Sequence, residues 1–201
     1  MQDITDKELY RTRLRFIDII KSFFISPPDS ERFSRWRGTF AALSKESITK
    51  EMDRHTSTLT TLIGSKKLED FTDEYYALFI DPFSETPLNL TASYHLDGRS
   101  QGESLINVRQ LIHDADIGID PTVKLPEDSL PVMMDILSTL IDQEADGSNT
   151  RHFQEKLIND LLTPSLNRMV QVAENNPIAE FYRACLEFCS AYIRLEKDLV
   201  G

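Results

Sequence analysis

Apolar side chains recur at helical spacing along most of this chain, and this periodicity limits the folds that the chain can adopt. The clearest case follows an i, i+3, i+4, i+7 pattern without a break, in Leu130, Met133, Met134, Leu137, Leu140 and Ile141. Only seven glycines occur among the 201 residues, and no Asn-Gly or Gly-Gly pair marks a tight hairpin turn. The pattern predicts an all-α fold, a helical bundle that forms one domain over residues 1–201.

Prolines and polar stretches predict where the helices are interrupted. Residues 81–99 form an irregular stretch that holds two prolines and a glycine, and residues 142–150 are polar. We expect mobile loops at both places. The dipeptide Asn176-Pro177 predicts the start of a long helix, because proline is favoured in the first helical turn behind a capping residue.

The charge balance of the chain argues against one class of partner and favours another. There are 33 acidic and 22 basic side chains, for a net charge of −11. Residues 1–67 have a net charge of +4 and residues 68–201 a net charge of −15, so the acidity belongs to the second part. A general nucleic-acid binder needs cations along the phosphates, so we expect no nucleic-acid partner. A basic partner suits the charge better.

The expected compartment is the cytoplasm. No stretch approaches the ~18 uninterrupted apolar residues of a membrane span, so no stable membrane insertion is expected. Met1–Lys7 carries two aspartates and lacks the apolar run of a secretory signal. Cys185 and Cys189 lie four residues apart in a helical segment, which does not suit a disulfide, and we interpret them as small buried side chains in a reducing cytosol.

Sequence motifs of common enzymes are absent. The chain has no glycine-rich phosphate loop, no Gly-x-Ser-x-Gly and no paired-cysteine zinc spacing, so we expect no catalytic residues, no metal and no cofactor. The dipeptide His113-Asp114 leaves one alternative open, a helical metal-dependent phosphohydrolase. A structural or dimerisation subunit is a further alternative, in which apolar patches are covered by a permanent partner.

Three segments, in order along the chain, match motifs of a single family. They are Asp73-Glu74-Tyr75-Tyr76-Ala77-Leu78-Phe79, then Leu88 to Gly102 with His95, Asp97, Arg99 and Gly102, and then Leu125-Pro126-Glu127-Asp128-Ser129-Leu130-Pro131. The set resembles the redox-enzyme maturation chaperones of the TorD, DmsD and NarJ superfamily. It is nearest to the nitrate-reductase-delta branch and the chaperones of type II dimethyl-sulfoxide-reductase enzymes. Ser129 departs from the family pattern, since many members have histidine there.

The resemblance implies a TorD-like helical fold and a cytoplasmic chaperone without catalytic activity. Such a chaperone holds the molybdopterin-containing catalytic subunit of a dimethyl-sulfoxide-reductase-family oxidoreductase, often by an N-terminal twin-arginine leader. It assists cofactor insertion before the subunit is exported or docked at the membrane. Either a monomer or a dimer is compatible with this interpretation.

A leader peptide is basic at one end and apolar in the middle, so its receptor needs an apolar groove beside negative charge. The predicted groove residues are Tyr75, Tyr76, Phe79, Tyr94 and Met133. The predicted charged residues are Asp97, Glu127 and Asp128. His95, Arg99 and Ser129 join this predicted partner site through the motifs, and Arg99 has the alternative of an ion pair with Asp97 or Glu103.

Overall fold

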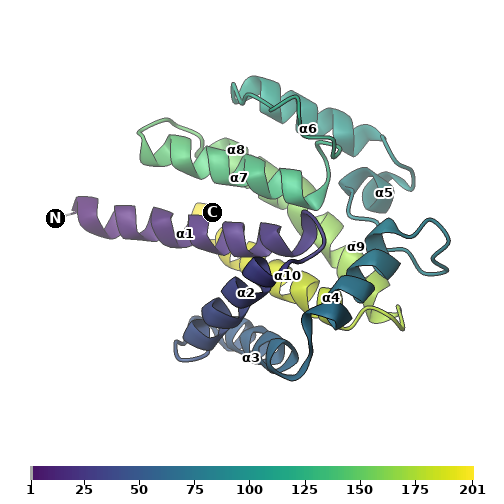
Figure 1. Cartoon of the computed structure of the whole chain (residues 1–201). Helices are drawn as coiled ribbons and strands as arrows, with labels where there is room; N and C mark the ends of the chain where they lie inside the picture. The colour runs from purple at the N-terminus through teal and green to yellow at the C-terminus, as the bar shows by residue number, and fades with distance from the viewer. Residues whose placement is uncertain (1) are drawn as a thin grey trace. The chain divides into compact units, whose positions relative to one another are not determined.

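The computed structural model describes the backbone of residues 2–201 and the side chains from residue 7 onward. Its elements are α1 (Gln2–Phe24), α2 (Ser30–Leu43), α3 (Lys50–Ser65), α4 (Leu68–Tyr75), the π-helix η1 (Tyr76–Ile80), α5 (Ala92–Asp97), α6 (Glu103–Asp114), α7 (Leu130–Ala145), α8 (Arg151–Lys156), the π-helix η2 (Leu157–Leu162), α9 (Thr163–Glu174) and α10 (Phe181–Val200) (Figure 1). The only β pairing in this range is an isolated antiparallel bridge between Thr91 and Ser129. The prediction of an all-α fold is confirmed.

Three details of the predicted helix boundaries differ from the structure. Residues 142–145, expected to belong to a loop, form the last turn of α7. The interval 81–99, expected to be irregular throughout, contains the short helix α5. The last helix begins at Phe181 instead of Pro177, because the side-chain oxygen of Asn176 accepts the N–H of Ile178 (3.0 Å) and holds residues 176–180 in a turn. The mobility of 81–99 and 142–150 stays a prediction.

The chain divides into two compact units. Unit 1 comprises Met1–Lys21, Leu90–Ser165 and Ile193–Gly201, and unit 2 comprises Ser22–Asn89 and Leu166–Tyr192. The expectation of one domain over residues 1–201 stays a prediction. No helix in the described part of the chain combines the length and the apolar composition that crossing a bilayer requires.

Helix α7 forms the centre of the apolar core of unit 1. Its six periodic apolar side chains are all fully buried, as their spacing predicts. The apolar side chains of η2, Leu157, Ile158 and Leu162, are also fully buried. Residues on α6 and α8 lie against η2 and α7, so the helices of residues 103–162 share one core.

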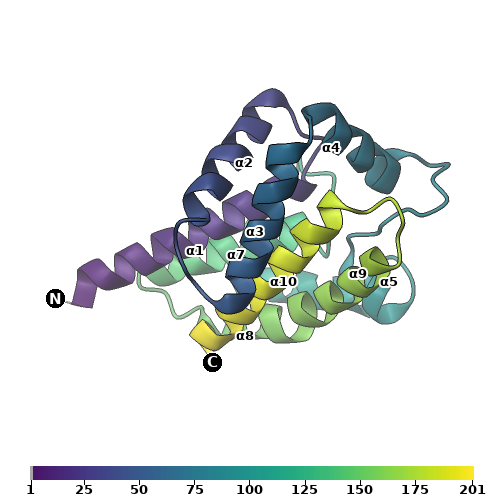
Figure 2. The same ribbon diagram turned by 90° about the horizontal axis from the view of Figure 1, so that it is seen from below.

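Aromatic rings fill the core of unit 2. The rings of Phe71 and Phe181 lie 4.4 Å apart and those of Phe23 and Trp36 lie 5.1 Å apart. The indole N–H of Trp36 donates to the Ser22 hydroxyl (2.8 Å), which satisfies the one polar group of this buried ring. Helices α2 and α3 lie side by side in both ribbon views (Figures 1 and 2). Cys185 and Cys189 are buried free thiols whose pKa values burial raises, as expected of unreactive side chains.

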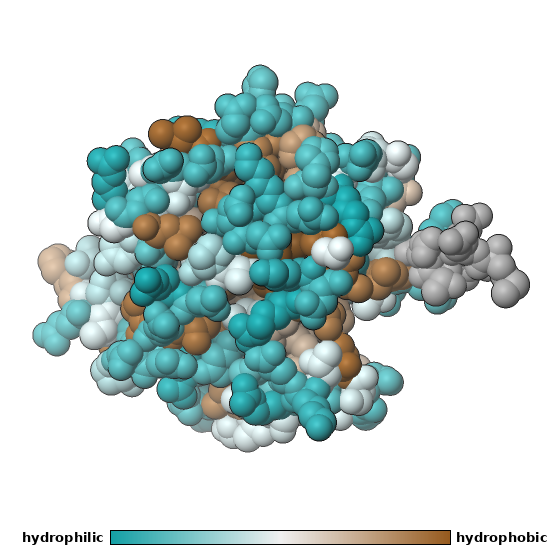
Figure 3. All heavy atoms as spheres, turned by 180° about the vertical axis from the view of Figure 1, so that it is seen from behind, coloured by the Kyte–Doolittle hydropathy of each residue, from teal (hydrophilic) through white to brown (hydrophobic). Residues whose placement is uncertain are grey.

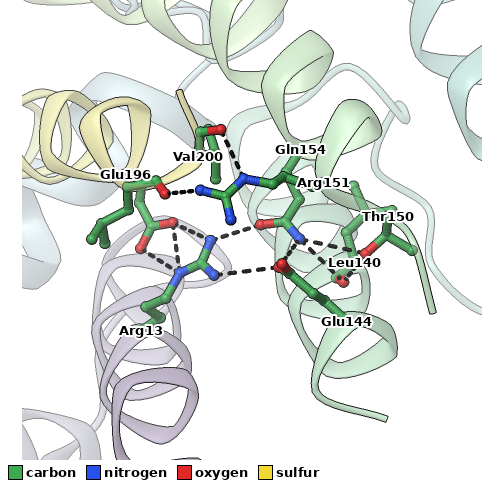
Figure 4. Close-up of polar contacts among 9 residues, drawn as sticks. Arg13, Leu140, Glu144, Thr150, Arg151, Gln154, Glu196 and Val200 are labelled. Carbon is green, nitrogen blue, oxygen red and sulfur yellow. Dashed lines mark hydrogen bonds and ion pairs between the residues drawn. The ribbon is translucent and has the colours of Figure 1, made fainter. Parts of the chain in front are cut away.

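A buried ion pair ties the first helix of unit 1 to the end of its last (Figure 4). The guanidinium of Arg13 donates to the carboxylate of Glu196 at 2.7 and 3.0 Å and to the Gln154 side-chain oxygen at 2.7 Å. The Gln154 amide in turn donates to Glu144 (2.7 Å), which lies 3.7 Å from the guanidinium. The side chains of Arg13 and Glu196 are 6% and 0% exposed, so each charge depends on the other for compensation.

Replacement of Arg13 by methionine should lower the free energy of unfolding by about 3–5 kcal/mol, because it leaves the Glu196 carboxylate buried and unpaired. The double variant Arg13→Met/Glu196→Leu should regain much of that loss. Urea unfolding followed by circular dichroism measures both values. The control is Lys21→Met, which breaks a more accessible pair with Asp135, whose side chains are 27% and 48% exposed, and should cost about 1 kcal/mol or less. A loss for Arg13→Met as small as the control would contradict the buried-pair interpretation.

Candidate partner-binding site

The first motif, residues 73–79, supplies a carboxylate that begins helix α10 in unit 2. Glu74 is buried, and its Oε1 accepts the N–H groups of Glu180 (2.9 Å) and Tyr182 (2.8 Å). Glu180 immediately precedes α10 and Tyr182 lies in its first turn, whose amides have no acceptors within the helix. Burial raises the pKa of Glu74, and the N–H bonds oppose this shift only in part.

The second motif forms the turn between α5 and α6 in unit 1. Asp97, the last residue of α5, accepts the N–H of Ser104 (2.8 Å) and the Ser104 hydroxyl (3.0 Å). A Cβ atom on Gly102 would lie 2.4 Å from Oδ2 of Asp97. The backbone of Gly102 has φ −82°, which any residue adopts, so the close approach of Asp97 is what requires glycine here.

The third motif lies against the second. The carboxylate of Asp128 accepts the N–H of Ser93 (2.8 Å), and the carbonyl of Asp128 accepts the N–H of Ala92 (2.8 Å). The N–H of Leu130 donates to the carbonyl of Leu90 (2.8 Å), beside the Thr91–Ser129 bridge. Residues that are 35 to 40 positions apart therefore pair side by side.

One geometry is common to the three motifs. The donors Ser93, Ser104 and Tyr182 each occupy the second position of their helix, and each meets a carboxylate from another segment. Capping by a side chain normally comes from the residue just before the helix. Here the cap comes from 7, 35 or 108 positions away in sequence, so it fixes the helix start and the segment that carries the carboxylate together.

The three carboxylates predicted to face a partner instead bind groups of the chain itself. Asp128 is 1% exposed and caps α5, so the expectation that it faces a peptide is wrong. Asp97 is half-buried and occupied by Ser104. Glu127 binds the guanidinium of Arg109 through two bonds of 3.0 and 3.1 Å, and this pairing lowers its pKa. The Oδ1 atom of Asp128 and the hydroxyl of Ser129 are buried without a hydrogen-bond partner.

Two of the predicted groove residues belong to the core. Met133 is fully buried, and Tyr75 is buried with its hydroxyl donating to the carbonyl of Phe24 (3.1 Å). Burial also raises the pKa of Tyr75. Phe79 is half-buried, with its ring 4.9 Å from that of Tyr75 and 5.2 Å from that of Tyr182. Tyr75 and Met133 therefore pack in the core, and Phe79 packs in part against Tyr75 and Tyr182, so these side chains do not line an open groove.

The remaining predicted residues are accessible and fall in different units. In unit 2, Tyr76 is 48% exposed. In unit 1, Tyr94 is 49% exposed and its ring lies 5.3 Å from that of the half-buried His95. Arg99 is exposed, and neither of its predicted ion pairs, with Asp97 or Glu103, occurs among the described side chains.

Sequence reasoning missed two apolar residues beside Tyr76. Ile80 is 51% exposed and Phe83 is 89% exposed. The side chain of Asp81 accepts the N–H of Phe83 (2.9 Å) and its carbonyl accepts the N–H of Ser84 (3.2 Å), so a turn presents the ring outward. We call Tyr76, Ile80 and Phe83 the η1 surface. The signal in the sequence was the Asp-Pro-Phe-Ser turn, in which a phenylalanine has no helical stripe to join.

The η1 surface lies in a stretch that carries negative charge only. Residues 68–89 contain six acidic residues and no lysine or arginine. Apart from Glu74 these carboxylates are exposed, in Glu69, Asp70, Asp73, Asp81 and Glu85. On the face of the molecule shown in Figure 3, hydrophilic residues predominate and apolar residues form small separate groups.

The structure offers no support for the phosphohydrolase alternative. The His113 side chain is 84% exposed and its ring nitrogen lies 3.3 Å from Asp114. Among the described residues, no three His, Cys, Asp or Glu side chains gather as a metal site would require.

Comparison with known proteins assigns the family. The family model of the nitrate reductase delta subunit matches residues 45–171, more than half of the chain and all three motifs. The chain belongs to the nitrate reductase delta subunit family. This family is of the redox-enzyme maturation chaperone type, whose members act on molybdoenzyme catalytic subunits and are not catalysts, so the chain is not an enzyme.

This delta-family chain was also compared with curated proteins and with solved structures. The search of curated proteins found no match. Among solved structures, the chain is similar to a candidate redox enzyme maturation protein from Archaeoglobus fulgidus, with 18% identity and a TM-score of 0.44 over 93% of this chain and 92% of the other.

Replacement of Gly102 by alanine should lower the free energy of unfolding by about 1–3 kcal/mol, because the added Cβ collides with the Asp97 side chain. In an Asp97→Gly background the same replacement should cost less than about 0.5 kcal/mol, since nothing remains to collide with. Urea unfolding of the four proteins in this cycle gives the coupling. Equal costs in both backgrounds would contradict the close approach.

The raised pKa of Glu74 predicts a definite pH dependence. Because the folded chain holds this proton more tightly than the unfolded chain does, the free energy of unfolding falls as pH rises from the unfolded pKa through the folded one. Glu74→Gln keeps an acceptor oxygen but does not titrate. The wild type should therefore lose stability relative to Glu74→Gln as pH rises above the ordinary glutamate pKa of about 4.3. Glu69→Gln, on the exposed side of the same helix, is the control. A difference that is flat with pH, or that grows in the other direction, would show that the site is not proton-linked in this way.

Proposed function

We propose that this chain is a cytoplasmic chaperone that binds the molybdopterin-containing catalytic subunit of a dimethyl-sulfoxide-reductase-family oxidoreductase by its N-terminal leader. The chaperone would assist cofactor insertion and assembly before the client is exported or docked at the membrane. Membership of the nitrate reductase delta subunit family supports the class of client. The observation that carries the proposal is the η1 surface within an all-acidic stretch.

The η1 surface fits the chemistry of a leader. Its three apolar side chains are 48–89% exposed, so water is in contact with surface that a partner could cover. An apolar leader segment would cover them, as an amphipathic helix covers an apolar groove. The stretch that carries the surface holds no cation to repel the basic end of the leader.

The surrounding carboxylates act on the encounter more than on the final affinity. Exposed charges attract a basic segment and raise its association rate, and salt screens this attraction. Their pairing with leader arginines would add little stability because it takes place in water. The apolar contacts must therefore supply most of the holding energy.

Residues of unit 1 provide a second set of contacts in this proposal. Tyr94, His95 and Arg99 stay candidates for client contact, since Tyr94 and Arg99 are exposed. The Arg99 guanidinium suits a carboxylate or a backbone carbonyl of the client. The proposal assigns no surface role to Asp128, Ser129, Tyr75 or Met133, which are buried.

The test is calorimetric titration with a synthetic peptide from the N-terminus of the client's catalytic subunit. We expect a Kd of about 1 μM or tighter at low salt, weakening as salt is added. The variant Ile80→Ser/Phe83→Ser should bind at least about tenfold more weakly, as expected when central apolar contacts are truncated.

The matched control is Ile106→Ser, which removes an isoleucine that is 64% exposed on α6 and lies outside the η1 surface. Both variants should keep the wild-type melting temperature, because the side chains removed are exposed. No heat with the wild type at any salt concentration would refute the proposed function. Tight binding by the wild type with unchanged binding by Ile80→Ser/Phe83→Ser would refute only the placement of the site. Light scattering adds a check: a wild-type dimer that this variant dissociates, with unchanged peptide binding, would make the surface a dimer interface.

A further inference from the structure

A cavity in unit 1 lies outside every site described above. It has a volume of about 190 Å³ and lies between residues 117–123 and one face of α7. The α7 side contributes Val132, Asp135, Ile136 and Thr139, whose spacing of three, four and seven places them on one helix face. The other side is formed by Ile117, Gly118, Ile119, Asp120 and Val123. We call these nine residues the α7 pocket.

The loop side of the α7 pocket is shaped by its own hydrogen bonds. Oδ1 of Asp120 accepts the N–H (2.8 Å) and the hydroxyl (2.7 Å) of Thr122, and the carbonyl of Asp120 accepts the N–H of Val123 (3.1 Å). This turn keeps Ile119 and Val123 43% and 45% exposed at the mouth. On the α7 side Val132 and Ile136 are buried and form the floor.

The volume of the pocket decides which kind of ligand fits. An apolar cavity of roughly 150 Å³ is enough to bind benzene. Sites for drug-sized molecules and cofactors occupy roughly 300–1,000 Å³. The α7 pocket, at about 190 Å³, therefore has room for one bulky side chain and not for a nucleotide or a pterin cofactor.

The charges of the pocket select among side chains. The lining holds two carboxylates, Asp120 and Asp135, and no cationic side chain. Asp135 is 48% exposed and its Oδ1 accepts a bond from Lys21 (2.6 Å). For the second oxygen of either carboxylate, the described residues provide no hydrogen-bond donor. Lys21 offsets the charge of Asp135, so the net negative charge at the pocket comes from Asp120; it disfavours an anionic ligand, whereas a cation next to the inserted side chain would find a free acceptor oxygen on either carboxylate.

We propose that the α7 pocket binds one bulky apolar side chain of a partner polypeptide that carries arginine or lysine next to that side chain. The apolar floor takes up the side chain, and Asp120 and Asp135 pair with the adjacent cation. The pocket shares no residue with the η1 surface, so this proposal does not depend on the proposed function. It assigns an interaction role to the segment 117–123, for which no motif had predicted one.

The test uses small probes in place of an unidentified partner. Backbone and methyl NMR spectra of the full chain are recorded during two titrations. One uses N-acetyl-leucyl-argininamide, and the other uses its uncharged counterpart, N-acetyl-leucyl-glutaminamide, in which glutamine replaces arginine. A third titration uses N-acetyl-leucyl-glutamic acid amide, which carries the opposite charge. We expect saturable shifts at Ile119, Val123 and Ile136 with a Kd of about 1 mM or weaker, as one buried side chain allows. The arginine probe should bind at least about threefold more tightly than the uncharged one, and the acidic probe should bind most weakly.

Two variants and two matched controls locate the contacts. Val123→Ser should abolish the shifts, whereas Val172→Ser, which removes a valine of similar exposure (43%) on α9, should leave them unchanged. Asp120→Asn/Asp135→Asn keeps both acceptors and should remove the preference for the arginine probe, whereas Asp142→Asn, an exposed residue of α7, should not. Shifts that are absent in the wild type, or that persist in Val123→Ser, would overturn the proposal. Equal affinity for the three probes would overturn the assignment of charge.

Discussion

A carboxylate that accepts a main-chain N–H from the second residue of another helix recurs in all three motifs; Glu74 and Asp128 are buried and reach helices far away in sequence, whereas the half-buried Asp97 caps the next helix. Glu74, Asp97 and Asp128 each make it, and each belongs to a different one of the three motifs. A local cap stabilises only the helix that it begins. A remote cap also fixes the segment that carries it, because the carboxylate keeps its bonds only if both parts are in place. The role that the structure shows for these motif carboxylates is therefore structural: they cap helices and hold neighbouring segments in place.

The same interaction changes how the acidity of the chain is to be interpreted. Acidic residues exceed basic ones by eleven, which favours a basic partner. Yet Glu74 and Asp128 are buried acceptors, and Glu127 is neutralised by Arg109. The charge that a partner could meet lies in the exposed acids, which include five within residues 68–89 and others, such as Asp120, elsewhere in the chain. Net charge alone therefore indicated the kind of partner but not the place where it would dock.

Periodicity predicted the fold class and the buried face of α7, because burial of an apolar stripe depends on local spacing. It did not predict the start of α10, which is set by Asn176 and by a glutamate more than a hundred positions away in sequence. The partner of Arg13, 183 residues distant, was equally beyond a single sequence. Tyr76, one of the predicted groove residues, is exposed, and its role there stays a prediction. Tyr75 and Met133 were offered to a groove although their spacing also fitted a core, and the core holds them. Phe83 was missed because no pattern of spacing separates an exposed phenylalanine in a turn from a buried one.

The exposed apolar area sets the strength with which such a chaperone can hold its client. Full burial of one large apolar side chain contributes about 1.5–3 kcal/mol, so the three residues of the η1 surface supply at most about 5–9 kcal/mol before the entropy of association is subtracted. From the η1 surface alone, that sum corresponds to a Kd of about the micromolar range, and the proposed contacts in unit 1 would make binding tighter. If the η1 surface holds the client as proposed, binding of this strength is reversible on its own. Release then needs no chemical step, which agrees with a chain whose family consists of chaperones and not of catalysts. A larger exposed apolar surface would slow dissociation of the client, but it would also retain a client whose folding was complete.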